Sequence, residues 1–216
     1  MTTLNPTGAS PAPAFPDDAS RVLAFWFAQA EGAPGLALSE RQASQQTRDA
    51  WFRKSDEFDA RCRNELGQLC ESALAGELDA WDGNTQSALA RIILLDQIPR
   101  NIFRGSPRAF AGDPAARASA EALIAHGALD HYTPFEQLFA LLPLEHAEDL
   151  SAQEASVRLF EGLAAREESM ASNADYARRH RDVISRFGRF PHRNAILGRA
   201  TTPEEAEFLK GPNSSF

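Results

Sequence analysis

The sequence predicts an all-α fold of antiparallel helical hairpins, and three observations support this prediction. Helix-start signals recur along the chain, apolar residues repeat at intervals of three and four, and no segment combines strict apolar/polar alternation with hairpin turn signals. Valine and isoleucine are scarce, whereas alanine and leucine, which favour helices, are abundant. We expect seven to nine helices joined by short turns that contain proline or glycine.

The first 16 residues are rich in proline and alanine and contain too few large apolar side chains to pack into a core. They have no apolar segment after a basic start, so they do not resemble a secretory signal peptide. We therefore expect a disordered arm over residues 1–16 and a single all-helical domain over residues 17–216. The longest strongly apolar run covers residues 92–95, far short of the roughly 20 that a membrane span requires. We therefore expect a cytoplasmic protein that does not span a membrane.

Five helix starts are predicted from residues that can satisfy the free amide groups of a first helical turn. Thr133 and Thr202 each precede a proline and are followed three residues later by glutamate, which completes a capping box. Ser39 and Ser151 have the capping box without the proline, and Asp113 is a cap followed by proline. We expect a helix to begin at each of these five residues.

Two apolar stripes with helical spacing indicate long helices. The first covers residues 58–73 and the second covers residues 176–187. Cys62 and Cys70 both lie in the first stripe, about 12 Å apart along a helix axis, so they cannot form a disulfide bond with each other. Reduced thiols agree with a cytoplasmic protein.

The net charge is −8, from 30 acidic and 22 basic residues, which argues against a nucleic-acid-binding surface. These charges are unevenly distributed. Residues 118–157 contain seven acidic residues and no Lys or Arg, whereas residues 176–199 contain seven arginines and one aspartate. Two interpretations remain open: the two stretches pair inside the fold, or the arginines form an electropositive concave face that collects an anionic ligand.

The helix that begins near Asn84 carries an acidic residue on its apolar face. Asp96 continues the spacing of the apolar residues before it, so we expect its side chain to point inward. A buried carboxylate must take up a proton or find donors. Pro99 ends or kinks the helix and re-aims the polar residues around it. Arg100, four residues after Asp96, and Gln97 are the candidate donors, and Asn101 and Arg104 are re-aimed together with Arg100.

Histidines lie close to charged residues at two further places. His146 and Glu148 match the first half of the zinc-deaminase signature, but the Pro-Cys-x-x-Cys half is missing. His180 lies in the second apolar stripe, and four further polar candidates follow it, namely Arg186, His192, Arg193 and Asn194. The four residues His146, Glu148, His180 and His192 could assemble a metal site from separate helices, but their spacing is not diagnostic, and we predict no metal.

Several common chemistries lack their motifs in this chain. It contains no phosphate-binding lysine loop, no glycine-rich dinucleotide turn and no Gly-x-Ser-x-Gly elbow, so we predict no cofactor. The segment RFGRFPHRN interleaves aromatic and cationic residues, a pattern that can bind single-stranded nucleic acid by stacking. The negative net charge and the shortness of this patch argue against a nucleic-acid partner.

Five segments carry long, specific motifs: VLAFWF at 22–27, WF at 51–52, LLDQIPRNIFRGSPRAFAGDP at 94–114, LLPLEHAED at 141–149 and RHRDVISRFGRFPHRNAILGR at 179–199. Together they resemble the bacterial family called domain of unknown function 924, over nearly the whole chain after the arm. This resemblance implies an all-helical, tetratricopeptide-like superhelical array and no named activity. The motif positions include Pro99 and every polar candidate named above from Asp96 to Asn194.

Three functions fit these residues. In the first, a cleft binds a small anion or a peptide carboxylate through directional donors, with Asp96 and Glu148 orienting the donors from behind. The candidate ligand-binding residues are Asp96, Gln97, Arg100, Asn101, Arg104, His180, Arg186, His192, Arg193 and Asn194.

The other two hypotheses use the same residues differently. The second is an enzyme in which His146 or His180 is a general base, Glu148 orients it and Arg100 stabilises negative charge. The third is a scaffold that binds a protein partner in an exposed groove, while the polar residues only lock the helices together. Of the three, we expect binding of an anion in the polar cleft. The sequence indicates no oligomeric state.

Overall fold

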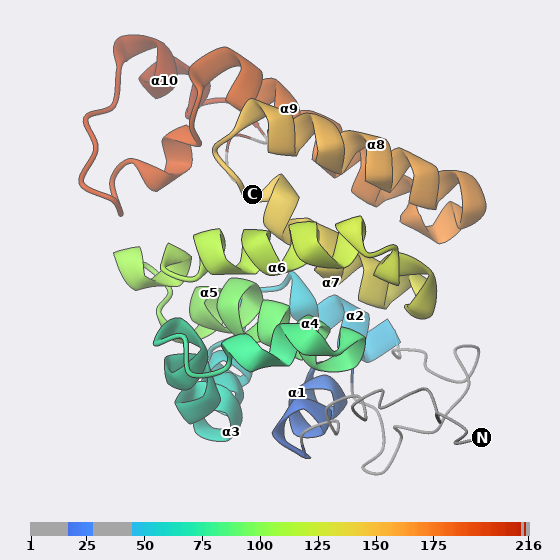
Figure 1. Ribbon diagram of the computed structural model, residues 1–216. Coiled ribbons are helices and arrows are strands. Elements are labelled where there is room, and N and C mark those ends of the chain that lie inside the picture. Colours follow the sequence, from blue (N-terminus) through green and yellow to red (C-terminus); the bar gives the residue numbers. More distant parts are fainter. Residues whose placement is uncertain (1–16, 28–44, 213, 215–216) are drawn as a thin grey trace, which may run out of the picture.

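The computed structural model describes residues 17–27, 45–212 and 214 of the 216-residue chain. The predicted arm over residues 1–16 and the helix start at Ser39 lie outside these residues. Within them, all regular structure is helical and no strand occurs, which confirms the all-α prediction (Figure 1).

The helices are α1 (Asp17–Phe27), α2 (Gln45–Trp51), α3 (Asp56–Leu74), α4 (Thr85–Ile92), the π-helical segment η4 (Ile93–Gln97), α5 (Ile98–Ile102), α6 (Asp113–Ala125), α7 (Pro134–Glu145), α8 (Leu150–Arg166), α9 (Ala171–Phe187) and α10 (Pro203–Phe208). Short 3-10 turns connect them, namely η3 (Asp79–Gly83), η5 (Pro107–Phe110), η6 (Ala128–His131), η7 (Glu168–Met170) and η8 (Pro191–Arg193). Because α4, η4 and α5 are continuous, the described part of the chain has nine helices, within the predicted range.

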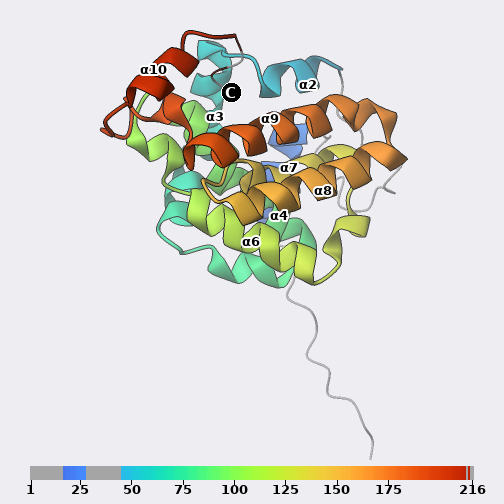
Figure 2. The same ribbon diagram turned by 90° about the horizontal axis from the view of Figure 1, so that it is seen from above.

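The helices are stacked in layers. Helices α8 and α9 run antiparallel, joined by η7, and form the uppermost layer in Figure 1, above α6 and α7. Seen from above in Figure 2, α8 and α9 lie side by side over α7, and contacts join α8 to both neighbours. The tetratricopeptide-like array that the family resemblance implies stays a prediction.

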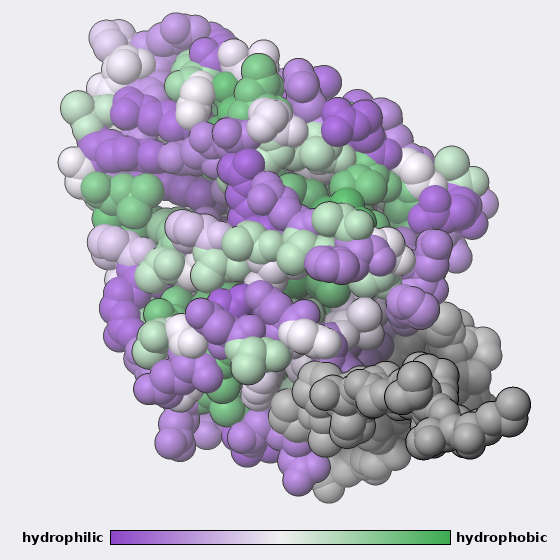
Figure 3. Space-filling view, viewed as in Figure 1, coloured by the Kyte–Doolittle hydropathy of each residue, from purple (hydrophilic) through white to green (hydrophobic). Residues whose placement is uncertain are grey.

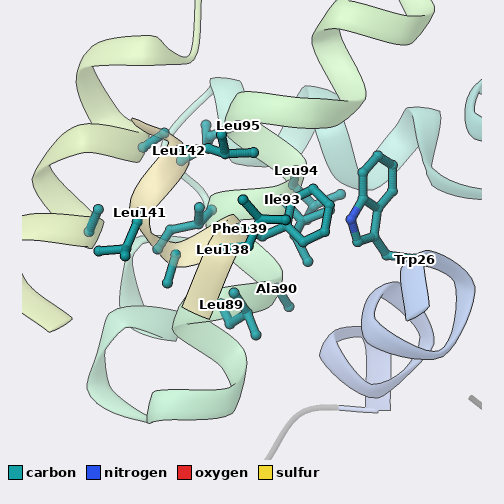
Figure 4. Packing of buried hydrophobic residues seen from close by; sticks show 14 of the residues in the cluster. Trp26, Leu89, Ala90, Ile93, Leu94, Leu95, Leu138, Phe139, Leu141 and Leu142 are labelled. Atoms are coloured by element: carbon teal, nitrogen blue, oxygen red, sulfur yellow. The ribbon is translucent and has the colours of Figure 1, made fainter. Parts of the chain in front are cut away.

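Two helices at the centre of the fold are buried on every side. All residues from Ser87 to Pro99, in α4, η4 and α5, are buried, and so are all residues from Glu136 to Glu145 in α7. Figure 4 shows apolar side chains of both helices packed together, with Trp26 of α1 beside Phe139 of α7. The rings of Trp26 and Phe139 meet edge to face with their centroids 5.3 Å apart. The polar side chains within these two ranges therefore lie inside the protein.

The predicted capping boxes of Thr133 and Thr202 are confirmed. Each threonine side chain accepts the amide of the glutamate three residues later, and that glutamate accepts the amide of the threonine. The prediction that Ser151 caps a helix is wrong, because Asp149 takes that place and its carboxylate accepts the Ala152 amide at 2.8 Å. A carboxylate at the start of the helix also complements the helix dipole.

Asp113 is not a cap either. Helix α6 begins at Asp113, as expected, but its cap residue is Gly112, and no side chain caps the helix. The carboxylate of Asp113 binds two arginines instead, as described below.

The two long apolar stripes form α3 and α9. Cys62 and Cys70 of α3 are buried and unpaired, as predicted. In α9 the prediction is wrong for Tyr176, which is 49% exposed, because the buried face of this helix passes through Ala174, Ala177 and His180. None of the helices in the described residues is both long and apolar enough to span a membrane.

Candidate functional site

The candidate site is built around a widened turn in the central helix. The segment Ile93–Gln97 is π-helical, and such turns are rare and frequently occur at functional sites. Pro99 follows it without ending the helix, which continues to Ile102. The π-helical segment includes Asp96, whose side chain is fully buried, as its spacing predicted.

The carboxylate of Asp96 is surrounded by donors. Nδ1 of His146 lies 2.7 Å and 3.0 Å from its two oxygens, and Nε2 of Gln97 donates to Oδ2 at 2.6 Å. Nη1 of Arg100 lies 3.2 Å from Oδ1. Burial alone would raise the pKa of Asp96, but the charge of Arg100 and the contact with His146 outweigh it and hold this pKa below its usual range. Asp96 is therefore ionised at neutral pH.

Arg100 connects Asp96 to the start of α6. Its Nη1 and Nη2 donate to the two oxygens of Asp113 at 2.8 Å and 3.0 Å, which is the paired geometry of a strong arginine–carboxylate contact. The same carboxylate accepts a longer hydrogen bond, of 3.3 Å, from Nη1 of Arg193. Two aspartates and two arginines from three distant segments of the chain thus form one network.

The guanidinium of Arg193 contacts two aromatic rings. Its Cζ atom is 4.7 Å from the ring centroid of Phe110 in η5 and 4.5 Å from that of Phe190, which is a cation–π distance in both cases. The side chain is only 7% exposed, and its Nε atom is buried without a hydrogen-bond partner. Burial, followed by the charge of Arg100, lowers the pKa of Arg193 to about 10, so the group remains a cation at neutral pH.

A second histidine–carboxylate pair lies beside the first. Nδ1 of His180 in α9 is 3.1 Å from Oε1 of Glu145 and 2.9 Å from the main-chain oxygen of Tyr176. The rings of His180 and His146 have centroids 6.4 Å apart. Burial, followed by the charge of Asp96, raises the pKa of Glu145 to about 8, whereas burial lowers the pKa of His180 to about 3. At neutral pH Glu145 is therefore largely protonated and His180 is neutral.

His146 is also neutral at neutral pH. Burial lowers its pKa and outweighs the opposite effect of Asp96. Because Nδ1 faces an ionised carboxylate, the proton of the neutral ring must be on Nδ1. The other nitrogen, Nε2, makes no hydrogen bond to the described residues, and the side chain is 15% exposed.

The remaining candidates of the central helix point away from Asp96. Asn101 donates to the main-chain oxygen of Gln97 at 3.0 Å. Arg104 forms two hydrogen bonds of 2.8 Å with Asp59 of α3 and one of 3.2 Å with Asn101. These contacts join α5 to α3 and do not bring Arg104 to the network of Asp96.

Two further candidates, Glu148 and Asn194, belong to a separate polar network. Glu148 accepts the Phe190 amide at 2.7 Å and pairs with Arg199, which also contacts Asn194. Asn194 in turn donates to Glu205 of α10 at 3.2 Å. This network holds the segment after α9 in place, so Glu148 does not orient a histidine as the sequence-based enzyme hypothesis required.

The last two candidates are Arg186 and His192. Arg186 pairs with Glu204 on the protein surface at 2.9 Å and lies outside the Asp96 network. His192 is half-buried, with its ring 5.6 Å from that of Phe190, and burial followed by Arg193 lowers its pKa to about 4. His192 thus borders the site on the side of Arg193.

Sequence reasoning missed four residues of the site. Asp113 was interpreted as a helix cap, and Glu145 was not assigned a role. Phe110 and Phe190 lie inside the long motifs, but the candidates predicted from the sequence were the polar residues beside them. Their alternation with arginine was the available signal, because aromatic rings and guanidinium groups stack on each other.

The uneven charges of the chain are partly paired with each other. Arg199 with Glu148 is an ion pair that connects the arginine-rich stretch to the acidic one. His180 and Glu145 also connect the two stretches, but as a contact between neutral groups. Other arginines of the stretch bind acidic residues elsewhere, such as Arg193 with Asp113. Among the residues described by the structure, no group of three His, Cys, Asp or Glu side chains is arranged to hold a metal ion.

Two side chains of the network are partly exposed to solvent. Arg100 is 20% exposed, in addition to the exposed part of His146. In the space-filling view of Figure 3, the surface is hollowed at the left. The hollow lies between the uppermost layer, formed by α8, α9 and the segment that follows them, and the layer of α6 below it. Arg193 of η8 and Asp113 of α6 belong to these two layers.

The chain is similar to proteins of unknown function. A family model described as "Bacterial protein of unknown function (DUF924)" matches residues 22–213. A solved structure, "Protein of Unknown Function ATU0120 from Agrobacterium tumefaciens", is 36% identical and has a TM-score of 0.74. The match covers 89% of this chain and 97% of that chain. A comparison with curated proteins gave no match.

Proposed function

This chain belongs to the bacterial family DUF924, whose description names no activity, and from the geometry of its site we propose that it binds a small anion. The anchor in this proposal is Arg193, and the observation that carries it is the incomplete hydrogen bonding of this buried guanidinium. The anionic group is a carboxylate or a phosphate, because both match the planar fork of arginine donors.

The arrangement around Asp113 explains why Arg193 has donors to spare. Asp113 accepts its two shortest hydrogen bonds from Arg100, and Arg193 donates a single, longer one of 3.3 Å to the same carboxylate. A buried donor without an acceptor costs free energy, and the cost is larger for a charged group. An anion next to Arg193 would supply the missing acceptors.

Phe110 and Phe190 restrict the orientation of the Arg193 guanidinium. Both rings lie within cation–π distance of its Cζ atom, at 4.7 Å and 4.5 Å. Such preorganisation reduces the entropy that binding would otherwise cost. The cation–π contacts also keep the side chain in place when no ligand is bound.

The test is a calorimetric titration of the protein with inorganic phosphate and with acetate, comparing wild type with the Arg193→Met variant. We expect at least one of these anions to bind the wild type, and the variant to bind it about tenfold more weakly or worse, because a charged hydrogen bond contributes about 1.5–3 kcal/mol. Arg108→Met is the matched control. Arg108 also stacks on a phenyl ring and pairs with a carboxylate, but it is 52% exposed and outside the site.

Two results would contradict the proposal. One is equal binding by wild type and Arg193→Met, which would place the anion elsewhere. The other is that the wild type binds neither phosphate nor acetate, although wild type and Arg108→Met both remain folded during the titration.

A further inference from the structure

We propose that Nε2 of His146 is a general base, which takes a proton from an acidic O–H or C–H group of the anion held at Arg193. This inference rests on the proposed anion site, because the anion is the molecule on which the base acts. It adds a chemical step to what would otherwise be a binding site.

The orientation of His146 supports this role. Its Nδ1 donates to the Asp96 carboxylate, so the lone pair of the neutral ring is on Nε2. A histidine oriented through one nitrogen by a carboxylate and reactive through the other is the base arrangement of many hydrolytic enzymes. Nε2 makes no hydrogen bond to the described residues, and the side chain of His146 is partly exposed to solvent.

Asp96 is held too firmly to take the proton itself. Gln97 and Arg100 contact its carboxylate, and its pKa is below the usual range because Arg100, His146 and Gln97 together outweigh the effect of burial. An ionised carboxylate in a fixed position stabilises the imidazolium that forms when His146 accepts a proton. Asp96 is thus a positioning residue, and His146 is the residue that would touch the substrate.

The proposed step involves a single proton. The bond between hydrogen and the donor atom of the bound molecule breaks, an N–H bond forms at Nε2, and the electron pair remains on the donor atom as a negative charge. Arg100 and Arg193 are the cations that can offset this charge, as oriented arginines do in other active sites. The step requires no oxidant, reductant or second substrate.

The base and the anion anchor are connected through contacting rings. The ring centroid of His180 is 6.4 Å from that of His146 and 5.6 Å from that of Phe190, and Phe190 in turn contacts the guanidinium of Arg193 at 4.5 Å. Arg193 and His146 both lower the pKa of His180, and both also lower the pKa of His192. In each case the burial of the imidazole is the larger cause. The charges of Asp96, Arg100 and Asp113, from η4, α5 and α6, act on His146, and the ring of His180 in α9 has its centroid 6.4 Å away. His146 also affects the pKa of His192.

The first test requires no variant and no knowledge of the natural ligand. Nitrogen-15 NMR of the histidine rings in the wild-type protein distinguishes a proton on Nδ1 from a proton on Nε2. We expect His146 to be the Nδ1–H tautomer at pH 7. An Nε2–H tautomer, or a doubly protonated ring at this pH, would overturn the proposal.

The second test measures reactivity with diethyl pyrocarbonate, which acylates the unprotonated nitrogen of imidazole. Peptide mass spectrometry gives the rate at His146 and at the exposed His126, whose Nδ1 contacts the neutral main-chain oxygen of Ala122. We expect Asp96→Asn to reduce the rate at His146 by about tenfold or more, as the loss of an orienting partner commonly does, and to leave His126 unchanged. An unchanged rate at His146 would overturn the role given to Asp96 and His146.

Inorganic phosphate separates this proposal from the one on which it rests. We expect phosphate to protect His146, but not His126, in the wild type, and to lose this effect in Arg193→Met. If His146 has the expected tautomer and reactivity but phosphate neither binds nor protects, the anion site fails and the basic histidine stands. If phosphate binds at Arg193 while His146 is unreactive, the anion site stands and the base fails.

Discussion

A Cβ atom on residue 112 would lie 2.1 Å from the main-chain oxygen of Leu95, so only glycine fits where the start of α6 meets the π-helical segment. This contact joins the two halves of the candidate site. Leu95 directly precedes Asp96, and Gly112 directly precedes Asp113. The close approach of the two backbones therefore helps to place both carboxylates within reach of Arg100, whose Nη1 contacts each of them.

Replacement of Gly112 by alanine is expected to destabilise the protein. The added methyl group would overlap a backbone oxygen, which cannot rotate away as a side chain can, so we expect a loss of about 1–3 kcal/mol or more. Urea denaturation measures this loss. Gly67→Ala is the control: Gly67 lies in α3 with its nearest contact at 3.9 Å, and alanine in a helix should stabilise it by about 0.5–1 kcal/mol. A Gly112→Ala variant as stable as wild type would show that the two segments can separate freely.

The two arginines of the site are expected to differ in their effect on stability. Arg100→Met leaves the carboxylates of Asp96 and Asp113 without their main cation, and breaking a buried pair in this way costs about 3–5 kcal/mol. Arg193→Met removes a buried cation with a single long hydrogen bond and keeps the packing against Phe110 and Phe190. Its stability should be unchanged or higher, because functional polar groups are often locally destabilising.

Thermal and urea denaturation of both variants, in buffer without phosphate, give this comparison. Equal and large losses would mean that Arg193 has a structural role like that of Arg100, and would weaken the case for a ligand next to it.

Much of the fold followed from local patterns. The capping boxes of Thr133 and Thr202 depend on residues within one turn, so their chemistry is readable without knowledge of the rest of the chain. The inward position of Asp96 followed from helical spacing alone. Asp149 was missed as a cap because Ser151 offered a competing signal two residues later, and local patterns do not show which of the two residues has the extended backbone of a cap.

The candidate site was less predictable because it depends on contacts between distant segments. The sequence predicted that Asp96 needs donors, and Arg100 lies one turn away, but the contact with His146 joins residues 50 positions apart. No sequence signal marked the π-helical segment. Arg104 and Arg186 are arginines within the same motifs, so the sequence does not distinguish them from the arginines of the site. In the structure they pair with Asp59 and Glu204, outside the Asp96 network.

Helix α8 is capped by Asp149 and not by Ser151, and two variants test this. Asp149→Ala removes the acceptor of the Ala152 amide and should cost about 1 kcal/mol, which is typical of the loss of a helix cap. Ser151→Ala should cost less, because the Ser151 hydroxyl donates to Asp149 and does not accept a helix amide. Urea denaturation of the two variants distinguishes the caps, and a larger effect of Ser151→Ala would show that Ser151 caps the helix after all.

Glu145 should make the stability of the protein depend on pH in a direction opposite to that of most acidic residues. Its pKa is raised by burial, and then by Asp96, from 4.5 to about 8 in the folded protein. Between these values the folded state binds a proton that the unfolded state has released. The free energy of unfolding should therefore fall as the pH rises, by up to about 1.4 kcal/mol per pH unit.

The clearest window for this measurement is pH 6.5 to 8. The pKa of His180 is lowered from 6.5 to about 3, and that of His192 to about 4, both chiefly by burial, so below pH 6.5 these histidines make stability rise with pH and oppose Glu145. Above pH 6.5 they are mostly neutral in both states. Glu145→Gln keeps the size of the side chain and an acceptor for His180, and it should flatten the loss of stability across this window. Glu154→Gln, on the exposed side of α8, is the control that should retain the wild-type slope. Urea denaturation at several pH values measures both slopes, and a Glu145→Gln profile identical to that of wild type would mean that Glu145 is already ionised in the folded protein, leaving Asp96 as one of two buried anions beside His146 and His180.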